Sequence, residues 1–559
     1  MTRYDRKHLI YLYWRESWRR VRRQLALAHF ALTRATVKIP ERLVVAPTDL
    51  RIIDPFVAEE IIADRFPLAG RMMATEGESP FLLPPPSPAF EARLHAFAWL
   101  RHIRADKSDE ACLKARRLVD QWIQTQGKRF DSAVWSVDIA AQRLIAWLSH
   151  SPVVLQGAES HFYRRFMKSI AVHIRYIRRM TEHCALPEAR FRARIALAMA
   201  SMALPLKPSA VRKAGLDLDR ELEAQIGADG GHISRNPRVA LDLLFDLLPL
   251  RQTYVNLGHD VPGRLIQGID RMYPALRFFR HQSGDLALFN GATATLANEL
   301  MAVLRYDETA GKPFRSLPHL DYHRLAAEGT VVLVDTGMAR SSDLSRNAHA
   351  GCLSFEMSSG RYRFVTNSGA PKFAGGDYRQ AARVTAAHST VVVNETSSAQ
   401  FSESDFLGPV MIGGVETVAA ERDQSASGAD RLLASHDGYL ASFGLIHERE
   451  LVLSADGARL RGADRFHARA KKGATPPPSH ATARFHVHPA IAIVPKSDDT
   501  VLLAAPDGES WLFSCPGFLV EITEDIFFAD ASGLRKSEQL EISFSIAETP
   551  EIRWEFRRA

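Results

Sequence analysis

The stretch Ala228-Asp229-Gly230-Gly231-His232-Ile233-Ser234-Arg235-Asn236-Pro237-Arg238 predicts a loop that ends at the start of a helix. Two adjacent glycines allow backbone angles that other residues avoid, which is typical of a turn. Asn236 followed by Pro237 is a favourable N-cap and first helical position for the apolar run that follows. The stretch therefore predicts a loop beside a helix N-terminus, inside a region of helices.

Three side chains of this loop carry chemistry of their own. His232 is titratable, Ser234 has a hydroxyl and Arg235 is a permanent cation, and a helix N-terminus beside them favours anions. This combination suits a ligand that bears a carboxylate. The alternative is a capped helix in which His232 is an ordinary histidine satisfied by hydrogen bonds.

Length and composition indicate a folded protein of more than one domain. The chain has 559 residues, whereas a single core stops growing at roughly 250 to 300 residues. A hydrophobic fraction of 46% with 24% charged residues is that of a globular protein. The net charge of +7 favours acidic ligands, and the four widely spaced cysteines form neither a disulfide framework nor a metal motif.

Residues 8–35 predict a basic amphipathic helix, with arginines beside Trp14 and Trp18. Such a helix is able to lie on an anionic membrane surface. The alternative is a solvated basic face whose aromatic side packs against the protein. No apolar run approaches the roughly 18 residues of a membrane span, and no secretory cleavage site follows the short apolar patch near the N-terminus.

Residues 88–310 show helical spacing throughout. For example, Val137, Ala141, Leu144 and Leu148 share one helical face. Similar runs occupy residues 109–125, 160–182, 190–204, 238–250, 262–281 and 286–304. Short breakers separate these runs, so we expect antiparallel helix pairs preceded by a lead-in over residues 1–87 that holds the basic helix and a Pro-rich loop.

Residues 325–559 change to a β pattern. Asp456-Gly457 and Asp507-Gly508 join short apolar runs in the manner of hairpin turns. Leu540, Ile542 and Phe544 alternate with polar residues, which predicts a strand with one buried and one solvent-exposed face. Strands of this kind predict an antiparallel β-sandwich.

The β region contains two groups of histidines. His349 and His388 fall at predicted strand beginnings, where they are able to face one another and, with a third ligand, to hold zinc. The alternative is that hydrogen bonds inside the sandwich satisfy both imidazoles. His486 and His488 alternate with apolar residues, which predicts a sheet edge with the histidines pointing outward or lining a polar groove. The sequence has no Walker loop, no nucleophile elbow and no dinucleotide-binding fingerprint.

Three motifs occur in a specific order: Asp-Gly-Gly-His-x-Ser-Arg-Asn-Pro at 229–237, Ala-His-Ala-Gly-Cys-Leu-Ser-Phe-Glu at 348–356 and Ala-Ala-His-Ser-Thr at 386–390. Together they resemble the heparinase II/III family of polysaccharide lyases. The resemblance implies an incomplete (α/α) toroid followed by an antiparallel β-sandwich, with an acidic glycan bound between them. It implies no nucleic-acid partner.

The family's reaction is β-elimination on uronic-acid polysaccharides. A base removes the proton at C5, and the substrate carboxylate is neutralised because negative charge accumulates there. By this resemblance we expect the catalytic residues to be His232, Arg235, Asn347 and Tyr254. We expect substrate contacts from Ser234, Asn236, Asn290 and Arg383. His349 and His388 match positions that hold a structural zinc in relatives, although the reaction itself requires no cofactor.

The chain departs from the family pattern at three places. Asn347 stands where relatives carry a catalytic histidine, and Asn367 stands where they carry an aspartate zinc ligand. The loop 284–291 has no tyrosine, so Tyr254 or Tyr273 would have to replace the family's catalytic tyrosine. The alternative is a glycan-binding or envelope-assembly protein that has lost catalysis.

Two further expectations concern chemistry and place. A toroid-type glycoside hydrolase with Asp229 as one of two carboxylates is a third hypothesis, for which the sequence offers no obvious second carboxylate. The resemblance implies the cell envelope or periplasm. The N-terminal segment, however, contains no recognisable export signal.

Overall fold

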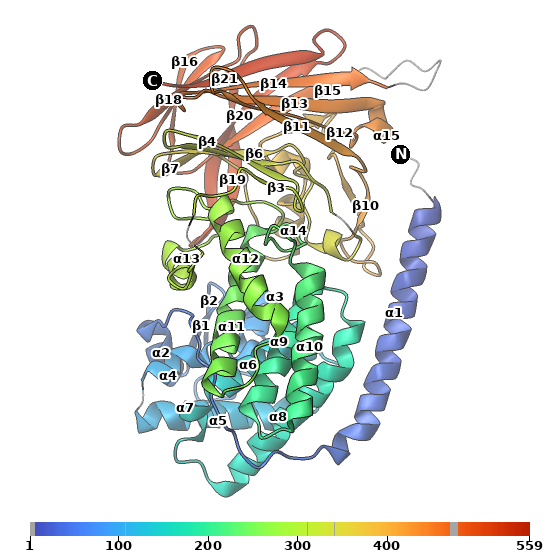
Figure 1. Ribbon diagram of the computed structural model, residues 1–559, viewed down its shortest axis with the longest axis vertical. Helices are drawn as coiled ribbons and strands as arrows, with labels where there is room; N and C mark the ends of the chain where they lie inside the picture. Colours follow the sequence, from blue (N-terminus) through green and yellow to red (C-terminus); the bar gives the residue numbers. More distant parts are fainter. Residues whose placement is uncertain (1–5, 107, 310, 340, 470–478) are drawn as a thin grey trace.

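The computed structural model describes residues 6–106, 108–309, 311–339, 341–469 and 479–559. It stacks a helical half and a β-rich half along the long axis of the molecule (Figure 1). This arrangement confirms the predicted fold class, a helical N-terminal region followed by antiparallel sheets.

The first described element is the predicted basic helix, α1 (Arg6–Thr33), which runs along the side of the helical half and reaches the β-rich half at its N-terminal end (Figure 1). Its inner face buries Leu12, Ala26 and Phe30. Helix α2 (Pro55–Ile62) and a hairpin of β1 (Arg65–Leu68) and β2 (Arg71–Ala74) complete the lead-in. Among the described residues, no helix combines the length and hydropathy needed to cross a bilayer.

The helical half is built from helices that pack pairwise on one another, several of them on helices that are not adjacent in the chain. These helices are α3 (Pro88–Ala96), α4 (Leu100–Ala105), α5 (Asp109–Thr125), α6 (Val137–Ser149), α7 (Ser151–Leu155), α8 (Ser160–Met180), α9 (Pro187–Ala203), α10 (Pro208–Gln225), α11 (Pro237–Asn256), α12 (Gly263–Phe279) and α13 (Ala297–Leu304). Helix α6 packs on α9, α9 on α10 and α11, and α10 and α11 on α12. Apolar faces at helical spacing therefore meet in one core, which contains the fully buried Trp122, Trp135 and Trp147.

The start of α11 confirms the predicted cap. The Asn236 side chain accepts a hydrogen bond of 2.9 Å from the backbone N–H of Arg238, and Pro237 occupies the first helical position. Gly230 has φ +84°, and a Cβ there would lie 1.7 Å from the carbonyl oxygen of Arg271. Gly230 is therefore required by the close approach of the loop to α12, and Gly231 by its contact with Leu320, whose side chain a Cβ would meet at 1.8 Å.

Two helix predictions need correction. The run 286–304 was expected to be helical, but only its last part forms a helix, α13. Asn290 and Gly291 have φ values of +48° and +85°, which lie outside the helical region. The segment 286–296 is therefore a loop between the two halves. Helix α10 was not among the predicted runs.

The β-rich half consists of two antiparallel sheets. One has the order β11 (Val418–Gln424), β12 (Asp430–His436), β13 (Leu445–Leu453), β14 (Arg459–Ala468), β21 (Glu551–Arg558), β18 (Ser510–Ser514), β17 (Thr500–Ala504) and β16 (Ala492–Ser497). The other has the order β19 (Glu521–Asp530), β20 (Gly533–Ser545), β15 (His480–Val487), β7 (Tyr362–Thr366), β6 (Phe355–Ser359), β5 (Thr330–Asp335), β4 (Tyr322–Ala327) and β3 (Ser316–Leu317), with β8 (Val391–Val393) also pairing with β15. A small hairpin of β9 (Gln400–Phe401) and β10 (Met411–Gly413) and the short helices α14 (Gly376–Ala381) and α15 (Leu440–Phe443) lie in the connections.

The sheets face each other across an apolar core. Phe485 of β15 lies 4.9 Å from Trp554 of β21 and 5.0 Å from Phe513 of β18, measured between ring centroids. Both predicted hairpins are present, as β13–β14 and β17–β18. The predicted sheet edge at 484–489 is wrong, because β15 lies inside its sheet and His486 is buried beside Asp525.

The outer face of β3–β5 packs on the helical half. Tyr322 of β4 contacts Phe279 of α12 with ring centroids 4.9 Å apart. Leu333 of β5 belongs to the same apolar cluster as the helices. This continuous core fixes the two halves against each other and positions the loops that meet between them.

Candidate functional site: a charged groove between the halves

A groove of about 460 Å³ is lined by residues of both halves. We call it the charged groove. Its charged lining consists of seven cations and five carboxylates: Arg51, Arg93, Arg101, Arg192, Arg238, Lys372 and Arg379, with Asp49, Asp138, Asp242, Asp246 and Glu299. The helical half supplies most of these side chains, while Lys372 and Arg379 come from the β-rich half. The groove is therefore formed where the two halves meet.

Three arginines neutralise all five carboxylates. Arg51 lies 3.4 Å from Asp49 and 2.8 Å from Asp246. Arg192 binds Asp138 and Asp246. Arg238 lies 3.0 Å from Asp242 and 2.6 Å from Glu299. These ion pairs fix the shape of the groove. Because each carboxylate is already neutralised by an arginine, the groove does not favour a cationic ligand.

The other four cations have no carboxylate within 4.0 Å among the described residues. Burial lowers the pKa of Arg101 to about 10, and it also lowers the pKa values of Arg93 and Lys372. Arg93 and Lys372 both lie near the Phe373 ring, at 5.5 and 5.4 Å from its centroid. Arg101 donates to the carbonyls of Ile52 and Ala98, but its charge, like those of the other three cations, is not neutralised by a carboxylate. Cations without a neutralising carboxylate attract an anion.

His232 does not project from its loop as predicted. Its Nδ1 accepts the backbone N–H of Ser234 at 3.1 Å, and its Nε2 donates to Gln225 at 2.9 Å. Burial lowers its pKa to about 3, so the imidazole is neutral near pH 7. His232 is thus the hydrogen-bonded structural histidine of the alternative hypothesis.

Arg235 and Asn290 form a joint between the halves. The Arg235 guanidinium binds Asp335 and donates to the carbonyl of Leu320 at 2.8 Å. Asn290 donates to Asp335 at 2.9 Å and to the Tyr322 hydroxyl at 2.7 Å. Both side chains are buried, and both N–H donors of the Asn290 amide are used within the protein. Their expected contacts with a substrate are replaced by contacts within the protein.

Arg383 and Tyr254 are also placed away from a ligand. Arg383 is buried and donates to the carbonyls of Ala348, Ser345 and Pro409, which fixes the loop before His349. Tyr254 is buried inside the helical half beside α10, with a Cβ placed on Gly215 3.6 Å from its hydroxyl. This position gives Tyr254 no route to a proton of a bound glycan.

Asn236, Asn347 and His349 are brought together around Gly291. A Cβ placed on Gly291 would lie 3.0 Å from the Asn347 carbonyl oxygen, 3.5 Å from Asn236 Nδ2 and 3.7 Å from His349 Nε2. The Asn347 side chain itself is exposed. Arg238 links this cluster to the charged groove. Its backbone N–H donates to the Asn236 side chain, and its guanidinium lines the groove.

His349 and His388 meet directly, although both lie in loops rather than at strand beginnings. His349 Nδ1 and His388 Nε2 are 3.1 Å apart, and His388 Nδ1 donates to the Val384 carbonyl at 2.8 Å. Because that carbonyl only accepts, His388 Nε2 must accept the proton of His349 Nδ1. The lone pair of His349 is therefore on Nε2, next to Gly291.

The residues here do not fit a structural zinc ion. Asn367 Oδ1 accepts the backbone N–H of Ser389 at 3.0 Å, which leaves its Nδ2, a donor, buried without a partner in the described part of the chain. An amide donor is no zinc ligand, and structural zinc sites use four. Within the described ranges, no three His, Cys, Asp or Glu side chains gather around one point.

Ser234 contacts a residue that the sequence analysis missed. Its hydroxyl bonds the Glu188 carboxyl, and burial raises the pKa of Glu188 to about 7, with Asp138 and Asp242 adding to the rise.

The sequence analysis also missed the cations of the charged groove. One signal was present: Asp242 and Asp246 lie four residues apart inside an apolar helix, which indicates a buried polar face. Arg93 and Lys372 lie far apart in sequence and gave no signal.

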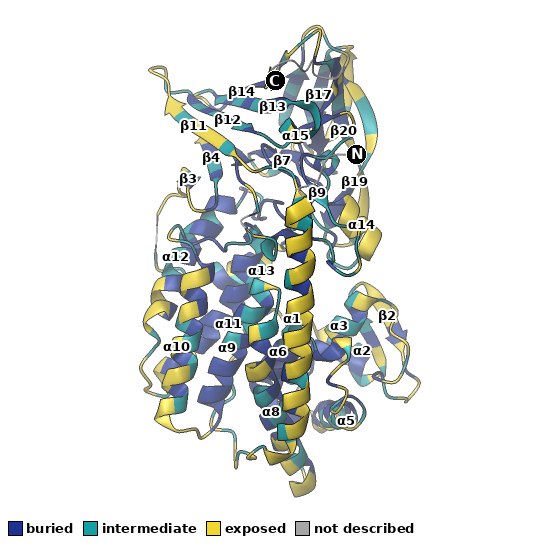
Figure 2. Ribbon diagram, turned by 90° about the vertical axis from the view of Figure 1, so that its right-hand side faces the viewer, coloured by how far each residue is buried: buried dark blue, intermediate teal, exposed yellow. Residues whose placement is uncertain are grey.

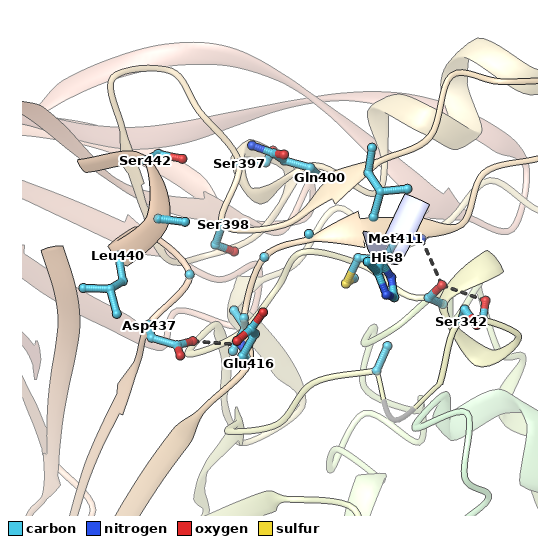
Figure 3. A pocket seen from close by; sticks show the side chains of 18 of the residues that line it. His8, Ser342, Ser397, Ser398, Gln400, Met411, Glu416, Asp437, Leu440 and Ser442 are labelled. Atoms are coloured by element: carbon cyan, nitrogen blue, oxygen red, sulfur yellow. Dashed lines mark hydrogen bonds between the residues drawn. The ribbon is translucent and has the colours of Figure 1, made fainter. Parts of the chain in front are cut away.

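A second pocket, of about 560 Å³, lies where the start of α1 meets the β-rich half. Figure 3 shows it lined by serine hydroxyls such as Ser397 and Ser398, with His8 on one side. The Asp437 carboxylate accepts hydrogen bonds from the backbone N–H groups of Glu416 and Thr417. The pocket's charged lining residues among the described ones are acidic apart from His8, so it does not favour an anionic ligand.

Comparisons with known proteins agree with this fold. A family model described as heparinase II/III-like, C-terminal, matches residues 309–555. FtsZ-localized protein C of Caulobacter vibrioides is 30% identical over 537 residues, which cover 93% of this chain and 91% of the relative. The crystal structure of heparinase III has a TM-score of 0.71 at 13% identity, covering 95% of this chain and 89% of that chain. Heparan sulfate lyase HepC from Pedobacter heparinus has a TM-score of 0.57 at 14% identity, with coverages of 95% and 88%. At such identities the two structures indicate a shared fold.

Proposed function

Because this chain belongs to the heparinase II/III-like family, we propose that it binds an acidic, uronate-containing glycan in the charged groove. The observation that carries the proposal is the set of four cations without carboxylate partners, Arg93, Arg101, Lys372 and Arg379. Carboxylates along a uronate chain are spaced anions that match several separate cations. The polar cluster around Gly291, which is two residues from the groove-lining Thr293, offers an amide donor and an imidazole acceptor.

We further propose that this binding does not lead to efficient β-elimination. The reaction needs a base at C5 and donors that neutralise the carboxylate. His232 and Arg235 are used within the protein, Asn347 is no base, and Tyr254 is enclosed by helices. The chain is then a glycan-binding protein on a lyase fold.

Slow β-elimination is the second candidate function, and one observation favours it. His349 Nε2 carries a lone pair, has no hydrogen-bond partner among the described residues and lies in the polar cluster around Gly291. A base in this position is able to accept a proton from a bound sugar. The two candidates differ in whether unsaturated uronate product is formed.

Binding and turnover are measured together to test the main proposal. Heparin, heparan sulfate, alginate and hyaluronan oligosaccharides are titrated calorimetrically, and the ultraviolet absorbance of the unsaturated product is followed. We expect at least one of these glycans to bind, with about tenfold weaker binding in Arg93→Gln/Lys372→Gln, since two charge-assisted contacts are lost. The control Arg212→Gln/Lys213→Gln removes two exposed charges on α10 and leaves affinity unchanged. Equal affinity of the groove variant and the native protein contradicts the proposal, as does failure of all four glycans to bind.

For cellular location, we propose that the chain is found with FtsZ at the cell envelope. The supporting observation is its identity with a relative named for FtsZ localisation, over nearly the full length of both chains. A fluorescent fusion imaged beside labelled FtsZ checks this. A reporter that works only after export, fused to the first 40 residues, tests the periplasmic location that the resemblance implied.

We also propose that α1 contacts an anionic membrane surface. The helix carries seven Lys and Arg residues against one Glu, and its outward side exposes Trp14 and Trp18 by 64% and 53%.

Finally, we propose that the protein folds without zinc. Metal analysis of the purified protein checks this proposal.

A further inference from the structure

A second basic site lies at the far end of α1, away from the charged groove. There the last turns of α1 and the short helix η1 (Arg34–Thr36) meet the end of α8, and Figure 2 shows α1 and α8 side by side at this end of the molecule. The pocket between them has a volume of about 450 Å³. Its lining is His29, Phe30, Thr33, Thr36, Arg175, Arg178 and Arg179. We call it the α1–α8 pocket.

The wall of this pocket is rigid. Phe30 is buried against Phe130 and Tyr176, with ring centroids 4.8 and 5.4 Å apart. Arg175 is held by its Nη1, which donates to the Thr33 carbonyl and to the Thr36 hydroxyl, the latter at 3.1 Å. Its Nε and Nη2 protons have no partner in the described part of the chain. Arg175 is therefore an anchored cation with donors still available.

The threonine hydroxyls use their protons within the backbone. Thr33 donates to the His29 carbonyl at 2.9 Å, and Thr36 donates to the Thr33 carbonyl at 2.9 Å. The donors left for a ligand therefore come from the basic side chains. Arg178 and Arg179 are exposed and form no hydrogen bond or ion pair with any described residue.

The positive charge in this pocket is uncompensated. No carboxylate lines it, whereas Arg165 on the same helix is paired with Asp120 at 2.7 Å. The pKa of the nearby His183 is lowered first by burial and then by the positive charges of Arg22 and Arg179. Three guanidinium groups near one another repel, and an anion of high charge offsets that repulsion.

We propose that the α1–α8 pocket binds a phosphate group. A phosphate ester carries a charge of roughly −1.5 to −2 near neutral pH and has three acceptor oxygens, which suits three guanidinium groups better than a single carboxylate does. The group belongs to a soluble phosphate ester or to a phospholipid headgroup. The headgroup source is consistent with Leu32, which lies beside the pocket's Thr33 and is 82% exposed. The proposal is independent of glycan binding in the charged groove.

The test uses the full chain with three probes at constant ionic strength: inorganic phosphate, glycerol phosphate, and vesicles of phosphatidylglycerol in phosphatidylcholine. Arg178→Gln/Arg179→Gln is compared with Arg164→Gln/Lys168→Gln, which removes two exposed charges from the same helix outside the pocket. Calorimetry measures the soluble probes and cosedimentation measures the vesicles. Thermal unfolding confirms that both variants are folded.

We expect the pocket variant to bind at least one probe about tenfold more weakly than the native protein, while the control variant stays within twofold. Saturable binding of glycerol phosphate identifies a soluble ester as sufficient. Binding confined to vesicles, and lost in the pocket variant, identifies the lipid headgroup. Two results overturn the proposal: none of the probes binds, or the pocket and control variants bind every probe alike.

Discussion

Arg235 lies at the joint between the halves, in a left-handed conformation with φ +62°. Its guanidinium binds Asp335 and stacks 4.7 Å from the centre of the Tyr322 ring. The Tyr322 hydroxyl in turn donates to the Arg235 carbonyl at 2.8 Å. The arginine in a motif typical of a glycan lyase therefore stabilises the junction on which the groove depends.

Replacing Arg235 by Met is expected to lower the free energy of unfolding by about 3–5 kcal/mol, because Asp335 is left as a buried charge without its main partner. Urea denaturation followed by fluorescence measures the change. Adding Asp335→Asn to the same chain recovers part of the loss, since the uncompensated charge is removed. A stable Arg235→Met protein that has lost glycan binding would instead restore Arg235 to a ligand-binding role.

At the residue scale, contacts between neighbours in the chain could be predicted from the sequence, whereas hydrogen-bond partners from distant segments could not. The cap of Asn236 on Arg238 could be predicted because capping depends on neighbours in the chain. The partners of His232, Arg235 and Arg383 could not, because they are carbonyls and carboxylates from distant segments. A motif predicts that such side chains gather in one region, but it does not predict whether they face a ligand or each other.

At the scale of elements, long amphipathic helices and hairpin turns were predicted closely. Helix α5 spans Asp109–Thr125, the predicted range, and Asp456-Gly457 and Asp507-Gly508 both join antiparallel strands. The failure at 286–296 has a physical reason. Its apolar residues Leu286 and Leu288 are buried between the halves, so they show hydrophobic spacing without helical backbone. A tertiary contact, the Leu288 N–H to the buried Glu356 at 3.1 Å, fixes this loop.

The exposed stripe of helix α1 contradicts one of the two interpretations of its sequence, whereas its aromatic Phe30 packs on the protein as that interpretation expected. The aromatic side was expected either to pack on the protein or to contact a membrane, and Figure 2 shows most of the helix exposed. Tyr11, Trp14, Trp18, Val21 and Leu25 follow one another at spacings of three and four residues on the outward side, each exposed by about half or more. Packing on the protein is therefore excluded for this stripe in the isolated chain.

Removing the two exposed indoles tests the membrane contact. Trp14→Ala/Trp18→Ala is expected to reduce cosedimentation with phosphatidylglycerol vesicles at least tenfold, since burying a large apolar side chain contributes about 1.5–3 kcal/mol. Binding to the anionic vesicles should weaken with added salt and be weaker on neutral phosphatidylcholine. Leu113→Ala, which truncates an exposed apolar side chain on α5, is the control. Vesicle binding that is unaffected by loss of both tryptophans would refute the proposal.

At the scale of the whole molecule, buried polar contacts tie the two halves into one unit. His281, which follows α12, lies 2.9 Å from Glu356 of β6 and 2.9 Å from the Ser358 hydroxyl. Arg324 of β4 donates to the carbonyls of Phe278 and Arg280 at the end of α12. With the shared apolar cluster, these contacts predict that the halves unfold together.

Stability is expected to fall as the pH is lowered from about 6.5 toward 4. Burial lowers the pKa values of His95 and His232 to about 3 and that of His323 to about 4, whereas an unfolded histidine titrates near 6.5. In this window the unfolded chain binds protons that the folded chain excludes, so the free energy of unfolding decreases by more than about 2 kcal/mol between pH 7 and pH 5. Urea denaturation at both values checks this. His323→Gln should flatten the dependence, whereas substitution of the exposed His161 should not, and a native protein equally stable at both pH values contradicts the expectation.

Helix α1 is held in place by residues that are synthesised hundreds of positions after it. Arg15 pairs with Asp343, Glu16 with Arg346, and Tyr13 with Ser404, separations of 328, 330 and 391 residues. While the ribosome is still producing the sandwich, α1 has no docking surface at its leading end. During this time its tryptophans and arginines are exposed to anionic and apolar surfaces. A bilayer or a chaperone is therefore able to bind α1 before the β-rich half has folded against it.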